Sequence, residues 1–182
     1  EILSVDASID YHLKEIPEIP SPLLETEISV PLVSETSSPL AIDKLHALYG
    51  MMSLSSFDDV YPPLQTILPL LDPDTLSKFS WEIFQVWYEG WDDIVSAKYR
   101  GQFGWSDKQK KIKKEAEWMY HCLGYMGNDQ TVKKLIPLIK SMPKFGEMNK
   151  AVTGLDILAN LSSDFAIRSI NRARLLTRWP LS

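Results

Sequence analysis

The chain has 182 residues, 45% of them hydrophobic and 24% charged, with a formal net charge of −5. This composition is typical of a folded globular protein, and it excludes collagen, a coiled coil and wholesale disorder. The single cysteine, Cys122, excludes an intrachain disulfide and a multi-cysteine metal site. No apolar run approaches the roughly 20 residues that span a bilayer, so we expect no membrane partner. Because the chain begins at Glu1 without methionine or a signal peptide, we expect it to be a fragment of a larger protein.

Residues 1–38 form a distinct acidic segment. They hold eight acids and one lysine, a net charge of −7, together with four prolines. Prolines at this density prevent a long helix, because each removes an amide donor and fixes φ. The segment also contains aliphatic residues, so we predict an extended Pro-rich acidic N-terminal arm that packs partly on a body formed by residues 39–182.

The body has the pattern of successive helices. Ser38 followed by Pro39 is typical of an N-cap with proline at the first helical position. Residues 91–106 lack periodicity and are predicted to form a loop. Ser106 is the predicted N-cap of a long helix that ends at Gly127, a candidate left-handed C-terminal cap. Further helices are predicted near 60–71, 73–90, 129–141, 147–161 and 164–178, so the fold class is all-α.

The predicted helix at 73–90 carries apolar residues on two sides. One side is an aromatic stripe with spacings of three, four and three, formed by Trp81, Phe84, Tyr88 and Trp91. A helix that is apolar on both flanks is usually buried between its neighbours, and aromatic side chains chiefly fill cores. The alternative is an exposed platform that stacks on bases or binds a peptide.

Two stretches of the chain match at an offset of 35 residues. Residues 123–126 align with residues 158–161, and Asp129 aligns with Asp164. Each unit has the pattern of a helix, a short turn and a second helix, with the aspartate as the predicted N-cap. A period of this length with two helices is typical of α-solenoids. The sequence therefore predicts a HEAT-like array of helical hairpins with six or seven helices.

A family resemblance covers roughly residues 40–170. Its motifs are Asp72-Pro73-x-x-Leu76, Phe79-x-Trp81 with Phe84 and Trp87, Gly127-Asn128-Asp129, Leu135-Ile136-Pro137-Leu138-Ile139-Lys140, Met142-Pro143, and Ala151-Val152-x-Gly154-Leu155-Asp156-Ile157-Leu158-Ala159. This series resembles the helical region of the bacterial MolR-like proteins, which are often WGR-domain-containing, although Met142 stands where tryptophan is usual. The resemblance implies a HEAT-like segment of a larger intracellular protein. It brings no catalytic residue, and the chain has no WGR signature.

No arrangement of residues predicts catalysis or metal binding. His121 and Cys122 are adjacent, so on a helix they point about 100° apart and cannot form a nucleophile–base pair. We expect Cys122 to be a buried, inert thiol. None of the three histidines has a histidine partner at i+3 or i+4, and no Gly-rich phosphate loop is present. We therefore predict no catalytic residue, no metal and no cofactor.

Gly154 and Asp156 are unusual for the interior of a helix. Glycine costs about 1 kcal/mol there relative to alanine, so Gly154 predicts a close helix crossing. Asp156 has apolar neighbours on both sides, and a buried carboxylate needs a partner. The predicted partner is Arg168 or Arg172 in a structural ion pair, and the alternative is a contact with a ligand or another protein.

Residues 98–150 form a basic stretch with twelve Lys and Arg and five acids, a net charge of +7. One interpretation is a solvated helix surface that carries local ion pairs. The other is binding to phosphates or to an acidic partner. The candidate contact residues are Lys110, Lys111, Lys114, Lys133 and Lys134.

These patterns favour a non-catalytic scaffold or protein-interaction module within a larger MolR-like protein, with protein partners that include other domains of the parent chain. The alternative function is a nucleic-acid-associated module that uses residues 98–150. Lys110 and Lys133 begin successive antiparallel helices, which separates their clusters by about 30 Å. We therefore predict no strong binding of nucleic acid at physiological salt.

Overall fold

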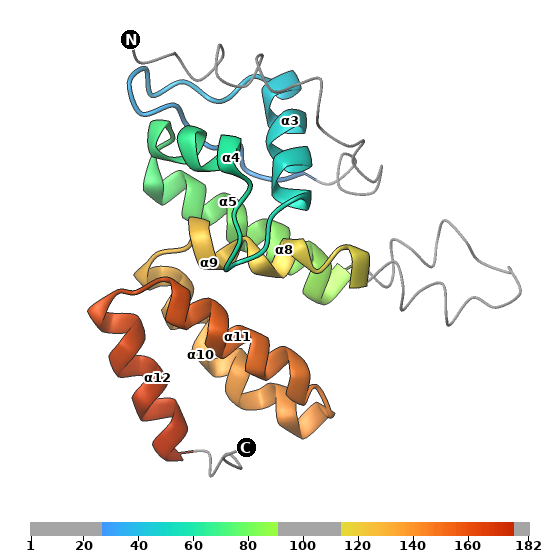
Figure 1. Ribbon diagram of the computed structural model, residues 1–182, viewed down its shortest axis with the longest axis vertical. Helices are drawn as coiled ribbons and strands as arrows, with labels where there is room; N and C mark the ends of the chain where they lie inside the picture. Colours follow the sequence, from blue (N-terminus) through green and yellow to red (C-terminus); the bar gives the residue numbers. More distant parts are fainter. Residues whose placement is uncertain (1–26, 91–113, 177–182) are drawn as a thin grey trace, which may run out of the picture.

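The computed structural model describes residues 27–90 and 114–176 (Figure 1). Its helices are α3 (Ile42–Ser53), α4 (Pro62–Ile67), η2 (Leu68–Leu70), α5 (Pro73–Gln85), the π-helix η3 (Val86–Gly90), α8 (Trp118–His121), α9 (Leu123–Met126), α10 (Asp129–Ser141), η4 (Met142–Phe145), α11 (Met148–Asn160) and α12 (Asp164–Leu176). Within these two ranges there is no strand, only isolated bridges that join residues 32 and 39 and residues 33 and 71. The all-α prediction is confirmed. None of the described helices has the length and apolar content needed to cross a membrane.

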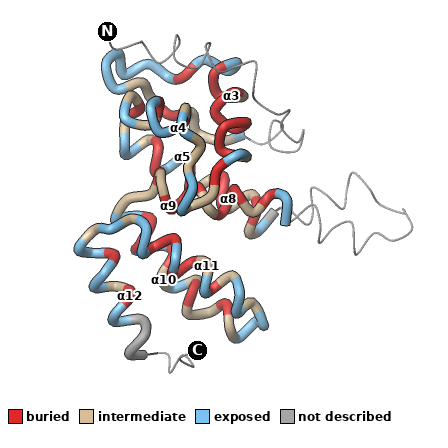
Figure 2. The backbone as a smooth tube through the Cα atoms, viewed as in Figure 1, coloured by how far each residue is buried: buried red, intermediate tan, exposed pale blue. Residues whose placement is uncertain are grey.

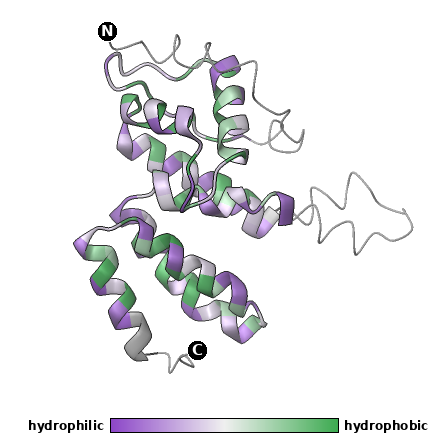
Figure 3. Cartoon of the chain, in the orientation of Figure 1, coloured by the Kyte–Doolittle hydropathy of each residue, from purple (hydrophilic) through white to green (hydrophobic). Residues whose placement is uncertain are grey.

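The helices form two groups that meet at α5, α9, α10 and α11 (Figure 1). In the first group, α5 packs against α8 and α9, and α3 packs against α4 and α8. In the second, α10, α11 and α12 all contact one another. Buried and exposed residues alternate along the helices of both groups (Figure 2). Hydrophobic and hydrophilic residues alternate around the helices in the same way (Figure 3), as expected for amphipathic helices.

The centre of the core is aromatic. Phe79, Phe84 and Trp87 are buried, as predicted for the helix at 73–90. The Phe84 ring stacks on Tyr120 with centroids 5.0 Å apart and on Tyr88 at 5.4 Å, and Trp87 stacks on Tyr120 at 5.3 Å. Rings at these separations add to the stabilisation from burial alone. Within the aromatic stripe, Phe84 is therefore core, as the first interpretation predicts, whereas Trp81 and Tyr88 are half-buried and Trp91 lies outside the described residues.

Residues 27–33 of the N-terminal segment are extended and lie along α5, and a turn follows at residues 34–36. The Ser29 N–H and hydroxyl donate to the Glu82 carboxylate at 2.6 and 3.0 Å. The Leu32 N–H donates to the Thr75 hydroxyl at 3.1 Å, and the Leu32 carbonyl accepts from the Asp72 N–H at 2.8 Å. These bonds satisfy backbone groups of the extended segment that have no neighbouring strand to pair with. Residues 1–26 of the predicted arm lie outside the described residues.

The first helix begins later than predicted. Helix α3 starts at Ile42 with Ala41 as its N-cap, so the prediction that Ser38 caps it is wrong. The Leu40 N–H instead donates to the Pro31 carbonyl at 3.0 Å, and Leu40 is buried. Because this pairing holds residue 40 against the extended segment, the helix can begin only after it.

The predicted long helix that ends at Gly127 is broken into shorter pieces. Its described part consists of α8 and α9, and Ser106 lies outside the described residues. Gly127 has φ −74°, so the predicted left-handed cap is wrong. A Cβ at Gly127 would collide with the Leu123 carbonyl and lie 3.0 Å from the Thr131 hydroxyl. Glycine is therefore required for space, not for a positive φ.

The 35-residue offset holds in the helix boundaries, since α10 spans residues 129–141 and α12 spans residues 164–176. The predicted caps are wrong by one residue. The Asn128 side chain accepts a hydrogen bond from the Gln130 N–H at 2.9 Å, and the Ser163 hydroxyl accepts one from the Ala166 N–H at 3.0 Å. Asp129 and Asp164 are instead the first helical residues, where a carboxylate interacts favourably with the helix dipole.

Gly154 lies at a close helix crossing, as predicted. A Cβ at this position of α11 would collide with the Tyr120 hydroxyl and lie 2.8 Å from Ile139 Cγ1. The Tyr120 hydroxyl donates to the Lys150 carbonyl at 3.1 Å, one turn before Gly154 on the same helix. The absence of a side chain thus lets α8, α10 and α11 approach one another.

Candidate functional site

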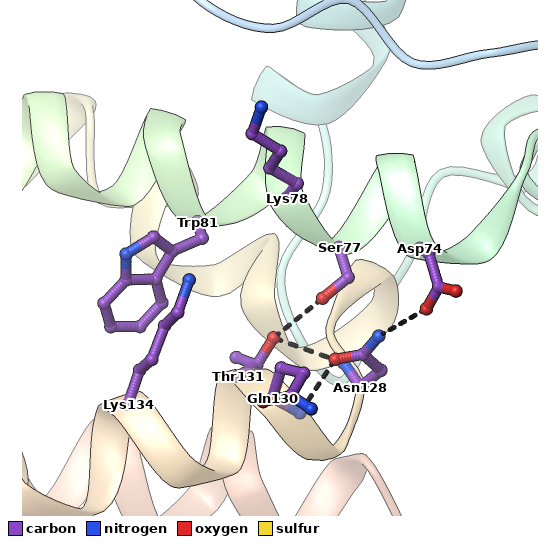
Figure 4. A pocket seen from close by; sticks show the side chains of 8 residues that line it. All are labelled: Asp74, Ser77, Lys78, Trp81, Asn128, Gln130, Thr131 and Lys134. Carbon is purple, nitrogen blue, oxygen red and sulfur yellow. Dashed lines mark hydrogen bonds between the residues drawn. The ribbon is translucent and has the colours of Figure 1, made fainter.

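A groove of about 360 Å³ lies between α5 and α10 (Figure 4). Helix α5 and the start of α10 supply its lining residues: Asp74, Ser77, Lys78 and Trp81 from the first, and Asn128, Gln130, Thr131 and Lys134 from the second with its preceding residue. The spacings within each set are those of one helix face. The groove is thus walled by two helix faces that the sequence separates by about fifty residues.

One end of the groove is a closed network of hydrogen bonds (Figure 4). Buried Ser77 and Thr131 lie with their hydroxyl oxygens 3.1 Å apart. The Asn128 amide donates to the Asp74 carboxylate at 3.2 Å, and the Asn128 N–H donates to the Thr131 hydroxyl at 3.2 Å. Asn128 and Thr131 form a capping box at the start of α10. The network therefore both begins α10 and ties it to α5.

The other end of the groove is formed by Trp81 and Lys134. Trp81 is half-buried, and its ring packs on Phe84 in the core with centroids 5.2 Å apart. The Lys134 ammonium lies 5.1 Å from the Trp81 ring centroid, a cation–π geometry. Lys78, by contrast, forms an ion pair with the Glu82 carboxylate at 3.7 Å. None of the ion pairs between described residues includes Lys134.

The remaining lysines of the predicted contact set are separated by the structure. Lys133 lies beside Lys134 on α10, with its ammonium 5.7 Å from the Phe165 ring of α12. Lys114 is exposed at the start of the second described range. Lys110 and Lys111, like Trp91 of the aromatic stripe, lie outside the described residues. Lys133 and Lys134 lie over different helices, α12 and α5, so the structure does not gather the described candidate lysines into one site.

The predicted ion pair of Asp156 is not formed. Asp156 is exposed, and Arg168 instead pairs with Asp164 at 3.7 Å on the surface of α12. No ion pair between described residues includes Asp156 or Arg172. Residues 152 and 156 of α11 share an exposed face, because a helix turns by about 100° per residue. Apolar sequence neighbours therefore do not bury the residue between them.

Lys150 has a structural role that the sequence did not indicate. Its ammonium lies 5.4 Å from the Trp87 ring centroid and 5.5 Å from that of Tyr88, and it pairs with Glu147. The Tyr88 hydroxyl donates to Glu147 at 3.3 Å, and burial followed by the Glu147 charge raises the pKa of Tyr88. This lysine joins η3 to the start of α11, and its charge is compensated within the chain.

The neighbouring pair His121 and Cys122 has no catalytic geometry. Cys122 is fully buried, as predicted, and burial raises the pKa of its thiol well above the usual range. The His121 ring packs edge-on against Phe57 with centroids 5.2 Å apart, and burial lowers the pKa of His121. Within the described ranges, no group of three or more His, Cys, Asp or Glu residues could hold a metal ion.

Cys122 is expected to react with a thiol reagent only when the protein unfolds. The thiolate is the reactive form, and burial disfavours it in the folded chain at neutral pH. Labelling with an aromatic disulfide reagent should therefore follow global unfolding, and its rate should rise with denaturant. Rapid labelling in native buffer, at the rate of an unfolded peptide thiol, would contradict the buried position.

The Asn128→Ala variant is expected to lose about 1–2 kcal/mol of stability, because it removes the N-cap of α10 and a bond to α5. The matched variant Asp129→Ala should lose less, about 0.3–1 kcal/mol, because it removes a dipole interaction and one exposed hydrogen bond, which the Ser163 hydroxyl donates at 2.8 Å. Urea unfolding followed by circular dichroism measures both. A larger loss for Asp129→Ala would show that the cap lies one residue later.

The described fold is that of an all-α protein with a groove between two helices. No family model matches the chain, and no solved structure matches it. The chain is similar to "Uncharacterized protein YehI" of Escherichia coli (strain K12), with 22% identity over 167 residues. The match covers 92% of this chain and 12% of that protein, so the chain spans a small part of the length of this relative.

Proposed function

We propose that the chain is a non-catalytic protein-interaction module within a larger MolR-like protein, and that the groove between α5 and α10 is its binding surface. The observation that carries the proposal is Trp81, an indole left half-buried in the groove beside Lys134, which has no acidic partner among the described residues. Tryptophan side chains in partly formed pockets dominate the binding energy of many interfaces.

The arrangement of the second helical group supports a HEAT-like array. Helices α10 and α12 share their boundaries at an offset of 35 residues, and both contact α11. Stacked helical hairpins of this kind present extended grooves and bind proteins through them. The match covers only a small share of YehI, which supports the proposal that the chain is one module of a larger protein. A cytoplasmic location belongs to the same proposal.

Site-specific photo-crosslinking tests the proposal. A photoreactive amino acid replaces Gln130, which lines the groove, or in a matched control Gln65, which is exposed on α4. We expect irradiation of cells that express the protein to give a discrete protein adduct from position 130 and not from position 65. The absence of a protein adduct at position 130, or the same adducts from both positions, would contradict the proposed surface.

The alternative, a nucleic-acid module that uses residues 98–150, requires lysines free to contact phosphates. Lys150 is paired with Glu147, and Lys134 lies over Trp81 in a groove whose opposite end carries the Asp74 carboxylate. We expect labelled duplex and single-stranded DNA and RNA to bind weakly at about 150 mM salt, with dissociation constants above roughly 1 μM. Tighter binding that weakens steeply with added salt would favour the alternative.

A further inference from the structure

Lys133 and Lys134, at the start of α10, have no carboxylate partner among the described residues, in contrast to three other basic residues. Lys78, Lys150 and Arg168 each lie within 4 Å of a carboxylate of the chain. Lys133 and Lys134 are exposed, and each has an aromatic ring as its neighbour, with no carboxylate in ion-pair distance among the described residues. Because neighbouring residues on a helix point about 100° apart, the two lysines face different surfaces, and only Lys134 faces the groove between α5 and α10.

The groove itself is polarised along its length. Lys134 and Trp81 form one end, and Asp74, Asn128 and Gln130 form the other (Figure 4). Asp74 and the Gln130 amide offer oxygen acceptors, which suit the N–H groups of an extended backbone. The Asp74 carboxylate repels a chain of phosphates, which carries a negative charge at every step. A ligand that matches both ends therefore needs backbone donors at one end and an acid at the other.

On the basis of the proposed function, we infer that the groove binds a short acidic peptide segment of a partner protein. A carboxylate of the segment pairs with Lys134 and draws its ammonium away from the Trp81 ring. An apolar side chain next to that carboxylate then packs on the uncovered indole, which supplies most of the buried apolar area. Backbone N–H groups of the segment donate to Asp74. The volume of about 360 Å³ accommodates a few side chains and not a folded domain.

Fluorescence polarisation with the full chain tests this inference. The probes are a short fluorescein-labelled peptide that carries one Glu next to one Phe in an otherwise uncharged sequence, and the same peptide with Lys in place of that Glu. We expect the acidic peptide to bind more tightly than the basic one, with an affinity that falls as salt is added, because the exposed charge pairs are screened.

Two charge-reversal variants distinguish the site from overall charge. Lys134→Glu reverses the charge in the groove, and Lys144→Glu makes the same change at an exposed position on η4. Lys134→Glu should weaken binding of the acidic peptide by roughly tenfold or more, and Lys144→Glu by less than about threefold. Equal effects of the two variants, or equal binding of the two peptides, would overturn the inference.

The outcomes separate this inference from the proposed function. A protein adduct from position 130, together with no preference for the acidic probe, would leave the interaction surface in place and remove the acidic occupant. The Lys134→Gln variant controls for misfolding of Lys134→Glu, because it removes the positive charge without introducing a negative one. Its urea midpoint should match that of the unmodified chain, while its affinity for the acidic peptide should lie between that of the unmodified chain and that of Lys134→Glu.

Discussion

Replacement of Phe84 with alanine is expected to lower the free energy of unfolding by about 3–5 kcal/mol. Phe84 is fully buried, and its ring contacts those of Trp81, Trp87, Tyr88 and Tyr120. Four aromatic rings cannot close around the space that the phenyl group leaves, so both the transfer energy and the cavity contribute to the loss. Urea unfolding monitored by circular dichroism gives the value.

The matched control is Phe165→Ala, which removes the same ring from an exposed position on α12. Phe165 retains 38% of its surface exposed and has the Lys133 ammonium as its ring partner. Its loss should cost less than about 1 kcal/mol, the value of an exposed cation–π pair. Similar losses for the two variants would contradict the position of Phe84 at the centre of the core.

The Gly154→Ala variant is also expected to be strongly destabilised, by about 1–3 kcal/mol or more. In an open helix the same change would stabilise the protein by about 1 kcal/mol, so its sign tests the structure. The added methyl group would collide with the Tyr120 hydroxyl and lie 2.8 and 2.9 Å from two carbons of Ile139. Both side chains are buried and have little room to move.

Two further variants identify the cause of the Gly154→Ala loss. Tyr120→Phe removes the hydroxyl that collides, so the double variant should recover part of the loss and show favourable coupling. Gly146→Ala provides the contrast, because a Cβ there meets nothing within 4 Å although φ is +77°. It should cost about 1–2 kcal/mol through backbone strain alone, with no dependence on Tyr120. A stabilised Gly154→Ala variant would contradict the close crossing.

The features that the sequence predicted depend on local signals. The periodicity of apolar residues located the helices, and glycine within a helix located the crossing at Gly154. The caps were misplaced because Asn128 and Asp129 are both good capping residues and stand side by side. The backbone decides between them: residue 128 has φ −136°, which is extended, and residue 129 is helical. That choice depends on tertiary contacts of the turn with α5.

The groove could not be assembled from the sequence because its contacts are long-range. Trp81 and Lys134 were both singled out, but they meet only through the packing of α5 on α10. Ser77 and Thr131 carried no signal of their pairing. Asp156 was expected to be buried because its neighbours are apolar, whereas its position on the helix face makes it exposed.

The most direct test of the proposed binding surface observes Trp81 itself. The chain has six tryptophans, and fluorine NMR of the fluorotryptophan-labelled protein reports each of them, with the signal of Trp81 assigned through Trp81→Phe. On addition of the acidic peptide, we expect the Trp81 signal to shift while those of buried Trp87 and Trp118 stay in place. Saturating peptide binding that leaves the Trp81 signal unchanged would contradict the groove between α5 and α10 as the binding surface.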